Sequence, residues 1–306
     1  MLKQVKALVL LSGGLDSILA VKLLLEQGIE VEAINFRTNF CGPSKARPAA
    51  QMLGVLLREV NIREDFLEVL KKPKHGYGAG MNPCIDCHAL MLKKAGVIMR
   101  EESFDFVATG EVLGERPMSQ HKQALDIVAK DADLKGYLLR PLSAKLLEPI
   151  IAEQEGLVDR EKLLAISGRS RKTQMALAAQ YGIKEYPTPA GGCALTQKDF
   201  ASRLKELMAN KPNFTPEDVD LVAIGRHKWF DGVQIILGRD KEENDILESI
   251  ATQDDILINP DGFVGPTALV RGGEAGLARA KELILEFSPK AKNLKEEEIR
   301  FKIKKV

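Results

Sequence analysis

The chain has 306 residues, a formal net charge of +1, and a content of 45% hydrophobic and 28% charged residues. This length suffices for two domains of ordinary size, and the composition excludes a disordered chain. No apolar stretch reaches membrane-spanning length and the first residues run directly into a predicted strand, so we expect a cytoplasmic protein without a membrane partner.

The first predicted elements are a buried strand over 5–11 and a helix over 18–25, joined by a short turn of polar residues and glycine. At such a junction the free N–H groups of the helix start and its dipole favour an anion. Glycine lets the backbone approach the anion closely, and the serines add hydroxyl donors. The residues of this predicted anion site are Ser12, Gly13, Gly14 and Ser17.

Asp16 is the acidic member of this turn. Its carboxylate would repel a phosphate unless a cation lay between them, so we interpret Asp16 as a ligand of Mg²⁺. The alternative is a helix N-cap without any ligand.

A second predicted strand over 29–36 completes a strand, helix, strand unit, which predicts a parallel sheet with ligands at the carboxyl ends of its strands. Phe36 leaves this strand at that edge, where it can pack on adenine or belong to the core. A helix over 47–55, a strand over 57–62 and a helix over 64–71 follow.

The glycine-rich loop 75–83 leads to Cys84 and Cys87, which begin a helix that continues to residue 100. Two cysteines three positions apart share one helix face, and the dipole at the helix start lowers the thiol pKa. Such a pair can hold a metal, form a redox couple or have no function.

The next predicted strand, 104–108, ends at Thr109, Gly110 and Glu111, again at a carboxyl edge. A helix over 122–130 and a strand over 137–143 follow, and Arg140 in this strand can stabilise phosphate charge or form a structural ion pair. Two further helices are predicted, over 158–167 and 172–181.

The turn Ser-Gly-Gly-Leu-Asp-Ser at 12–17 resembles the pyrophosphate-binding loop of the PP-loop ATP pyrophosphatases. Thr109-Gly110-Glu111 with Gly114 and Ser119-Gln120, and then the run 139–142, resemble later motifs of the tRNA 4-thiouridine synthetases. This resemblance covers about residues 5–195. It implies an adenine nucleotide alpha hydrolase-like fold, a parallel doubly wound α/β sheet that binds ATP, with Thr109 and Gly110 among the nucleotide-binding residues. The chain departs from the best-known members in having no RNA-binding region ahead of the loop and no rhodanese-like domain behind it.

Cys193, in the glycine- and proline-rich loop 189–193, adds a third cysteine to Cys84 and Cys87. Three thiolates are one ligand short of a closed zinc site but suit a cluster with one open coordination position. This set resembles the iron–sulfur-dependent tRNA thiolation enzymes, which implies a 4Fe–4S cluster held by these three residues. The alternatives are a persulfide on Cys193 with Cys84 or Cys87 as its partner, a zinc site completed by His88 or Cys41, or unlinked cysteines. Cys41 is taken as structural by default.

From residue 196 the composition changes, which predicts an adenylating domain over 1–195 and a smaller α+β domain over 196–306. The run 226–230 places basic residues beside two aromatic ones. The runs 238–247 and 256–258 resemble the RNA-binding domain of NFACT-type proteins. Basic side chains there would contact phosphates and Trp229 would stack on a base, unless Trp229 and Phe230 are core residues.

Together these features predict an ATP-dependent tRNA sulfurtransferase that adenylates a uridine carbonyl, releases pyrophosphate and AMP, and takes sulfur from a sulfide or persulfide carrier. One alternative is a PP-loop enzyme with another acceptor, of the amidating or lysidine-forming type. Another is a non-catalytic RNA-binding protein. The sequence leaves open whether the protein forms a homodimer.

Overall fold

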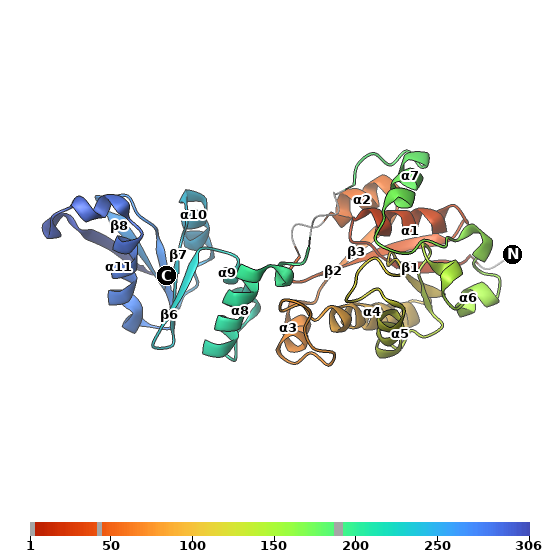
Figure 1. The fold of residues 1–306 in the computed structure, drawn as a ribbon, viewed down its shortest axis with the longest axis horizontal. Coiled ribbons are helices and arrows are strands. Elements are labelled where there is room, and N and C mark those ends of the chain that lie inside the picture. The colour runs from red at the N-terminus through yellow and green to blue at the C-terminus, as the bar shows by residue number, and fades with distance from the viewer. Residues whose placement is uncertain (1–3, 42–44, 187–191) are drawn as a thin grey trace. The chain divides into compact units, whose positions relative to one another are not determined.

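The computed structural model describes residues 4–41, 45–186 and 192–306 (Figure 1). The chain divides into two units, Met1–Gln197 and Lys198–Val306. Within the described ranges, no helix is both long enough and apolar enough to cross a membrane.

A sheet of five parallel strands forms the centre of the first unit, in the order β3-β2-β1-β4-β5. The order reverses between β1 and β4, and ligands of such sheets bind outside the carboxyl ends of the strands at this reversal. The predicted doubly wound α/β fold is therefore confirmed. The strands are β1 (Lys6–Leu10), β2 (Glu30–Arg37), β3 (Leu56–Asn61), β4 (Phe106–Thr109) and β5 (Leu138–Leu139).

Helices cover both faces of this sheet, with α1, α2 and α7 on one face and α3, α4 and α5 on the other (Figure 1). Successive residues of β1 point to opposite faces, so Val9 joins the core beneath α1 and Leu8 joins the core beneath α4. The helices are α1 (Leu15–Leu25), α2 (Ala46–Leu53), α3 (Arg63–Lys71), α4 (Cys84–Glu101), α5 (Lys122–Asp131), α6 (Ile151–Gln154) and α7 (Lys172–Gln180), with short 3-10 turns η1 (Ala144–Leu146), η2 (Arg160–Lys162) and η3 (Ala194–Thr196).

The predicted helix over 158–167 is wrong, because only η2 forms there and the residues after it leave the helical conformation. Leu164 N donates to Pro141 O at 3.0 Å, and Gly168 N donates to Leu113 O at 2.7 Å. These bonds to distant segments satisfy the backbone groups that a helix would pair locally. The segment is thereby fixed beside the ends of β4 and β5.

The second unit contains an antiparallel sheet in the order β10-β8-β9-β7-β6, as expected for an α+β domain. Ile235 and Ile236 of β7 face opposite sides and join the cores beneath α11 and α10, respectively. The elements are α8 (Lys198–Asn210), α9 (Pro216–Val222), β6 (Arg226–Phe230), β7 (Val233–Leu237), α10 (Lys241–Ile250), β8 (Asp255–Asp261), β9 (Ala268–Arg271), α11 (Leu277–Glu286) and β10 (Arg300–Lys305), with 3-10 turns η4 (Glu274–Gly276), η5 (Pro289–Asn293) and η6 (Glu296–Glu298).

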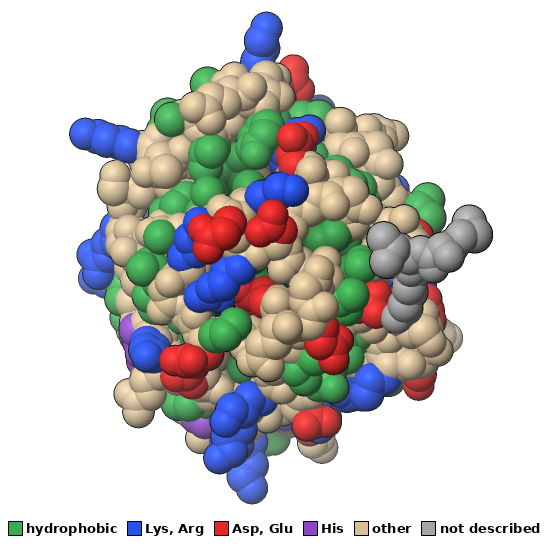
Figure 2. Space-filling model, turned by 90° about the vertical axis from the view of Figure 1, so that its right-hand side faces the viewer, with side chains coloured by type: hydrophobic (Ala, Val, Ile, Leu, Met, Phe, Trp, Pro, Cys, Tyr) green, Lys and Arg blue, Asp and Glu red, His purple; other side chains and the backbone are tan. Residues whose placement is uncertain are grey.

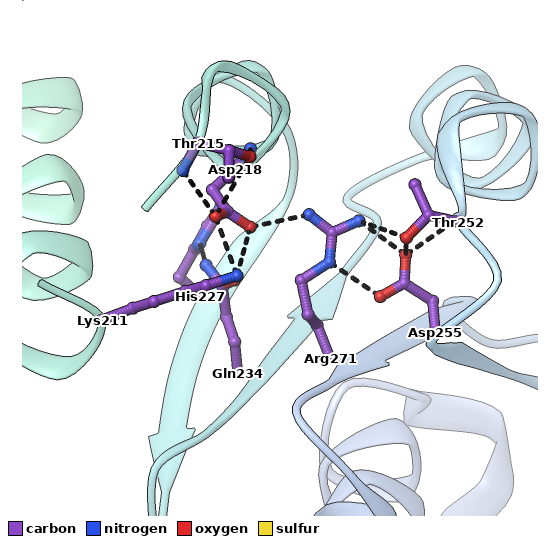
Figure 3. Close-up of polar contacts among 8 residues, drawn as sticks. All are labelled: Lys211, Thr215, Asp218, His227, Gln234, Thr252, Asp255 and Arg271. Carbon is purple, nitrogen blue, oxygen red and sulfur yellow. Dashed lines mark hydrogen bonds and ion pairs between the residues drawn. The ribbon is translucent and has the colours of Figure 1, made fainter. Parts of the chain in front are cut away.

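A buried ionic network joins α9, β8 and β9 (Figure 3). The Arg271 guanidinium donates to Asp255 Oδ1 and Oδ2 at 2.7 and 2.6 Å, and to Asp218 Oδ1 at 2.9 Å. Lys211 also pairs with Asp218, at 2.8 Å. Because both carboxylates are almost inaccessible to water, their charges depend on these cations for compensation.

We expect Arg271→Ala to lower the free energy of unfolding by about 3 to 5 kcal/mol, because it leaves buried carboxylates without a full counter-charge. Chemical denaturation of the whole chain measures this loss. The control is Arg279→Ala, whose pair with Glu282 is exposed and should contribute less than about 1 kcal/mol. Equal effects of the two substitutions would contradict the assignment.

Candidate active site

The hydroxyl groups of the turn between β1 and α1 form hydrogen bonds within the turn. Ser17 Oγ donates to Gly14 O at 2.8 Å, and the hydroxyls of Ser12 and Ser17 lie 3.2 Å apart. Gly13 has a φ of 79°, and a Cβ there would lie 2.2 Å from Lys45 O. Only glycine fits this position, and the turn lies at the positive end of α1, where anion binding by the backbone amides stays a prediction.

The loop that follows β4 packs directly on this turn. A Cβ at Gly110 would lie 2.5 Å from Ser17 N and 2.6 Å from the carbonyl carbon of Asp16. Sequence segments about ninety positions apart thus meet at the reversal of the strand order. This contact brings together the two loops that the sequence predicted for nucleotide binding.

Asp16 is paired with Arg171, which directly precedes α7. Arg171 Nε also lies 3.5 Å from Glu115 Oε1. Burial and the charge of Asp16 raise the pKa of Glu115, against the opposing effect of Arg171. Sequence reasoning missed Arg171 and Glu115; the only signal was a cluster of basic residues at 169–172.

Glu111 anchors a second buried group of charges. It accepts hydrogen bonds from Arg140 Nε at 2.9 Å and Thr109 Oγ1 at 3.1 Å, and its Oε1 lies 2.7 Å from His88 Nδ1. Burial opposes ionisation of Glu111, but Arg140 and His88 outweigh it and lower the pKa to about 2. The sequence left two roles open for Arg140, a structural ion pair and stabilisation of phosphate charge. The structure shows the ion pair with Glu111, and the contact with phosphate stays a prediction.

Phe36 is 6% exposed and belongs to the core beneath α4. The sequence allowed Phe36 to pack on adenine or to belong to the core, and the structure places it in the core. Its packing on adenine stays a prediction.

Backbone hydrogen bonds hold the cysteine-bearing segments together. Ala194 N donates to Phe40 O at 3.4 Å, which joins the residues next to Cys193 and Cys41. Met81 N donates to Leu195 O at 3.0 Å and so ties the loop ahead of α4 to η3. Residues 189–191 of the predicted cysteine loop lie outside the described part of the chain.

Neighbouring thiols affect the ionisation of Cys87 and Cys193. Burial raises the pKa of Cys87 well above its ordinary value, and Cys193, Cys41 and Cys84 raise it further. Burial together with Cys41 and Cys84 raises the pKa of Cys193 to about 11. The prediction of a lowered thiol pKa at this helix start is wrong for Cys87, because burial and the neighbouring thiols raise its pKa. Cys41, taken as structural by default, lies near enough to Cys87 and Cys193 to affect their pKa.

The chemistry of this donor set fits a metal cluster, because thiols are the ligands of iron–sulfur centres. The geometry of the described structure does not yet fit such a cluster. Within 4–41, 45–186 and 192–306, no three His, Cys, Asp or Glu side chains are arranged to hold a metal ion.

In the basic and aromatic run 226–230 on β6, some side chains pack within the domain and others are exposed to solvent. The Arg226 guanidinium lies 4.9 Å from the ring centre of Phe287 and is held against the domain. His227 contacts the carbonyl oxygens of Leu221 and Ile224 through Nε2, and burial lowers its pKa to about 4. His227 is therefore neutral at physiological pH and adds no charge for phosphate binding.

Lys228 and Phe230 are the exposed members of this run, with the Phe230 residue 41% accessible. Trp229 is half-buried, and its Nε1 is a buried donor with no hydrogen-bond acceptor among the described residues. Phe230 therefore offers a more accessible ring than Trp229, the residue selected from the sequence.

The reversed strand order, the glycine-rich turn at the positive end of α1 and the acidic Asp16 beside it define a nucleotide-binding α/β protein of the PP-loop class. The family model described as "Thiamine biosynthesis protein (ThiI)" matches residues 2–155, and the chain belongs to this family. The model described as "NFACT protein RNA binding domain" matches residues 225–306.

The chain is similar to the tRNA-specific 2-thiouridylase MnmA of Thermotoga petrophila, with 29% identity over 185 residues, 52% of this chain and 50% of the relative. It is also similar to MnmA 1 of Syntrophus aciditrophicus, with 29% identity over 227 residues, 66% of this chain and 55% of the relative. The chain thus spans about half the length of the curated relatives it matches.

Two solved structures resemble the chain at low similarity. A 4-thiouridine synthetase in complex with RNA and bound ATP has a TM-score of 0.40 and 19% identity, over 71% of this chain and 52% of that one. A predicted subunit of a tRNA methyltransferase from Methanocaldococcus jannaschii has a TM-score of 0.38 and 18% identity, over 57% and 76%.

We expect Glu111→Gln to lower the free energy of unfolding at pH 7 by about 3 kcal/mol, because Arg140 becomes a buried cation without a full counter-charge. Chemical denaturation measures the loss. Glu161→Gln is the control, since its pair with Lys145 is exposed and should contribute less than about 1 kcal/mol.

This stability difference should also depend on pH. The pKa of Glu111 is lowered from 4.5 to about 2, so its ionised form contributes stability above pH 4.5 that is lost as the pH falls toward 2. The gap between wild type and Glu111→Gln should be constant near neutrality and narrow below pH 4.5. A gap that is unchanged at pH 3 would show that the charge of Glu111 is not its cause.

Proposed function

We propose that this protein is an ATP-dependent tRNA sulfurtransferase that makes thiouridine. The observation that carries the proposal is the glycine-rich turn at the positive end of α1, packed against Gly110 at the reversal of the sheet. The match of residues 225–306 to an RNA-binding domain model supports an RNA acceptor. The MnmA relatives, whose names describe tRNA thiolation, support sulfur as the transferred atom.

In the proposed reaction the uridine carbonyl oxygen attacks the α-phosphorus of ATP, and the bond to the β-phosphate oxygen breaks to release pyrophosphate. A sulfur nucleophile then attacks the activated uridine carbon, and AMP leaves with the former carbonyl oxygen. The amides and hydroxyls of Ser12, Gly13, Gly14 and Ser17 would bind the pyrophosphate portion. Thr109 and Gly110, in the adjacent loop after β4, would also contact the nucleotide.

Asp16 would hold the Mg²⁺ of ATP in this site. Its Oδ1 is a buried oxygen that accepts no hydrogen bond in the described part of the chain, and carboxylate oxygens are the ligands that Mg²⁺ prefers. Mg²⁺ bound there would reduce the repulsion between Asp16 and phosphate and stabilise the charge of the leaving pyrophosphate.

The sulfur chemistry is assigned to the cysteines. The thiols of Cys84, Cys87 and Cys193 would have to move together to hold a 4Fe–4S cluster, because the described side chains are not arranged to hold a metal ion. Such a cluster would supply an open iron position for sulfide. A persulfide on Cys193 with Cys84 or Cys87 as its partner, or a zinc site, are the alternatives that metal analysis separates.

RNA binding is assigned to the second unit. Lys228 and Phe230 on β6 pair an exposed cation with an exposed ring, which suits a phosphate and an unpaired base. Figure 2 shows the end of the first unit, where basic and acidic side chains are interspersed, so this view does not bear on the RNA-binding residues of the second unit.

We expect Asp16→Ala to lower the rate of pyrophosphate release by at least about 100-fold, because it removes the cation ligand beside the phosphates. Salt-dependent RNA binding should be unchanged. The control is Asp133→Ala, since this carboxylate is exposed. Pyrophosphate release that persists in Asp16→Ala would overturn the assignment of the loop. If the wild type itself releases no pyrophosphate, a non-catalytic RNA-binding protein would be favoured.

Metal analysis tests the role of the cysteines. After anaerobic purification and reconstitution, we expect about four iron and four acid-labile sulfide per chain in the wild type, and a clear loss of both in Cys193→Ser. Little iron in the wild type would overturn the cluster and leave the persulfide or zinc alternatives. Full activity with all three cysteines changed to serine would instead favour an amidating or lysidine-type acceptor.

A further inference from the structure

Arg171 reaches the nucleotide loop from a firmly anchored segment. The chain ahead of it is fixed by the bond from Gly168 N to Leu113 O, at 2.7 Å, and by the parallel bridge between Ser167 and Leu113. Arg171 then precedes the first turn of α7. Its guanidinium is thus presented at the carboxyl edge of the sheet by ordered backbone on both sides.

The ion pair between Arg171 and Asp16 joins residues 155 positions apart, and each side chain is only 15% exposed. Glu115 approaches the same guanidinium at 3.5 Å. Two carboxylates and one guanidinium carry a formal charge of −1 when all are ionised. This negative charge lies beside the backbone amides that would bind the phosphates.

The three side chains do not satisfy one another completely. Asp16 Oδ1 is a buried acceptor without a hydrogen-bond partner in the described structure, and Arg171 Nε makes no hydrogen bond there although it lies 3.5 Å from Glu115 Oε1. A pair built only for stability would be expected to satisfy both groups, because an unpaired buried polar atom costs free energy. The unused acceptor suits a cation, and the unused donor suits an anion.

We propose that Arg171 is a phosphate-binding residue of this site that neutralises Asp16 until ATP binds. This inference rests on the proposed function above. When ATP binds, the guanidinium leaves Asp16 and donates to phosphate oxygens, and Asp16 becomes free to ligate Mg²⁺. No covalent bond changes in this exchange, and Asp16 and Arg171 each keep a partner of opposite charge.

The guanidinium is suited to this exchange because its planar array of donors binds carboxylate and phosphate with the same geometry. A lysine would keep the charge but lose the two-point contact. Replacing Arg171 with lysine should therefore lower the rate of pyrophosphate release more than it lowers the stability of the fold.

The test compares Arg171→Ala, Arg171→Lys and wild type. Calorimetric titration with a non-hydrolysable ATP analogue and Mg²⁺ gives the dissociation constant, and pyrophosphate release gives kcat. We expect Arg171→Ala to weaken analogue binding about 10-fold and lower kcat about 100-fold, with Arg171→Lys between it and wild type. The matched control is Arg169→Ala, because Arg169 is exposed and lies two positions away on the same segment.

Unchanged binding and kcat in a folded Arg171→Ala protein would overturn the proposal and leave a structural ion pair. If Arg171→Ala does not fold, Arg171→Lys and Arg171→Gln decide by the same measurements, and values equal to wild type in both overturn it. The proposed function fails differently, because wild type itself would then bind no analogue and release no pyrophosphate.

Discussion

The close approach of Gly110 to the start of α1 is the constraint on which the arrangement of the first unit depends. β1 and β4 are neighbours, so the loops at their carboxyl ends must share one small space. A side chain at Gly110 would collide with the backbone of Asp16 and Ser17. Because the atoms in this contact are backbone atoms, substitution of Gly110 would displace the turn itself.

Buried ion pairs recur in both units and have the same physical basis. Glu111 is compensated by Arg140 in the first unit, and Asp218 and Asp255 by Arg271 in the second. Burying charges is costly, and hydrophobic replacements of such groups are often as stable. In each case the cation joins elements distant in sequence, so we expect these pairs to select one arrangement of loops rather than to add much net stability.

The strands, most helices and the nucleotide loop could be predicted because their signals are local: apolar runs, glycine turns and helix periodicity. The helix over 158–167 was wrong because the backbone of Leu164 and Gly168 bonds to segments that no local pattern reveals. Arg171 could not be assigned to Asp16 for the same reason, since 155 positions separate them. The cysteines were recognised as a group by spacing, but the proximity of Cys41 depends on the folded loops.

The hydrogen bonds from Ala194 N to Phe40 O and from Met81 N to Leu195 O also set the order in which the molecule can assemble. A chain emerging from the ribosome has made Cys41, Cys84 and Cys87 long before the segment that closes both bonds exists. The loops around these thiols therefore remain untied until synthesis has passed residue 195, although β1 to β4 are already complete.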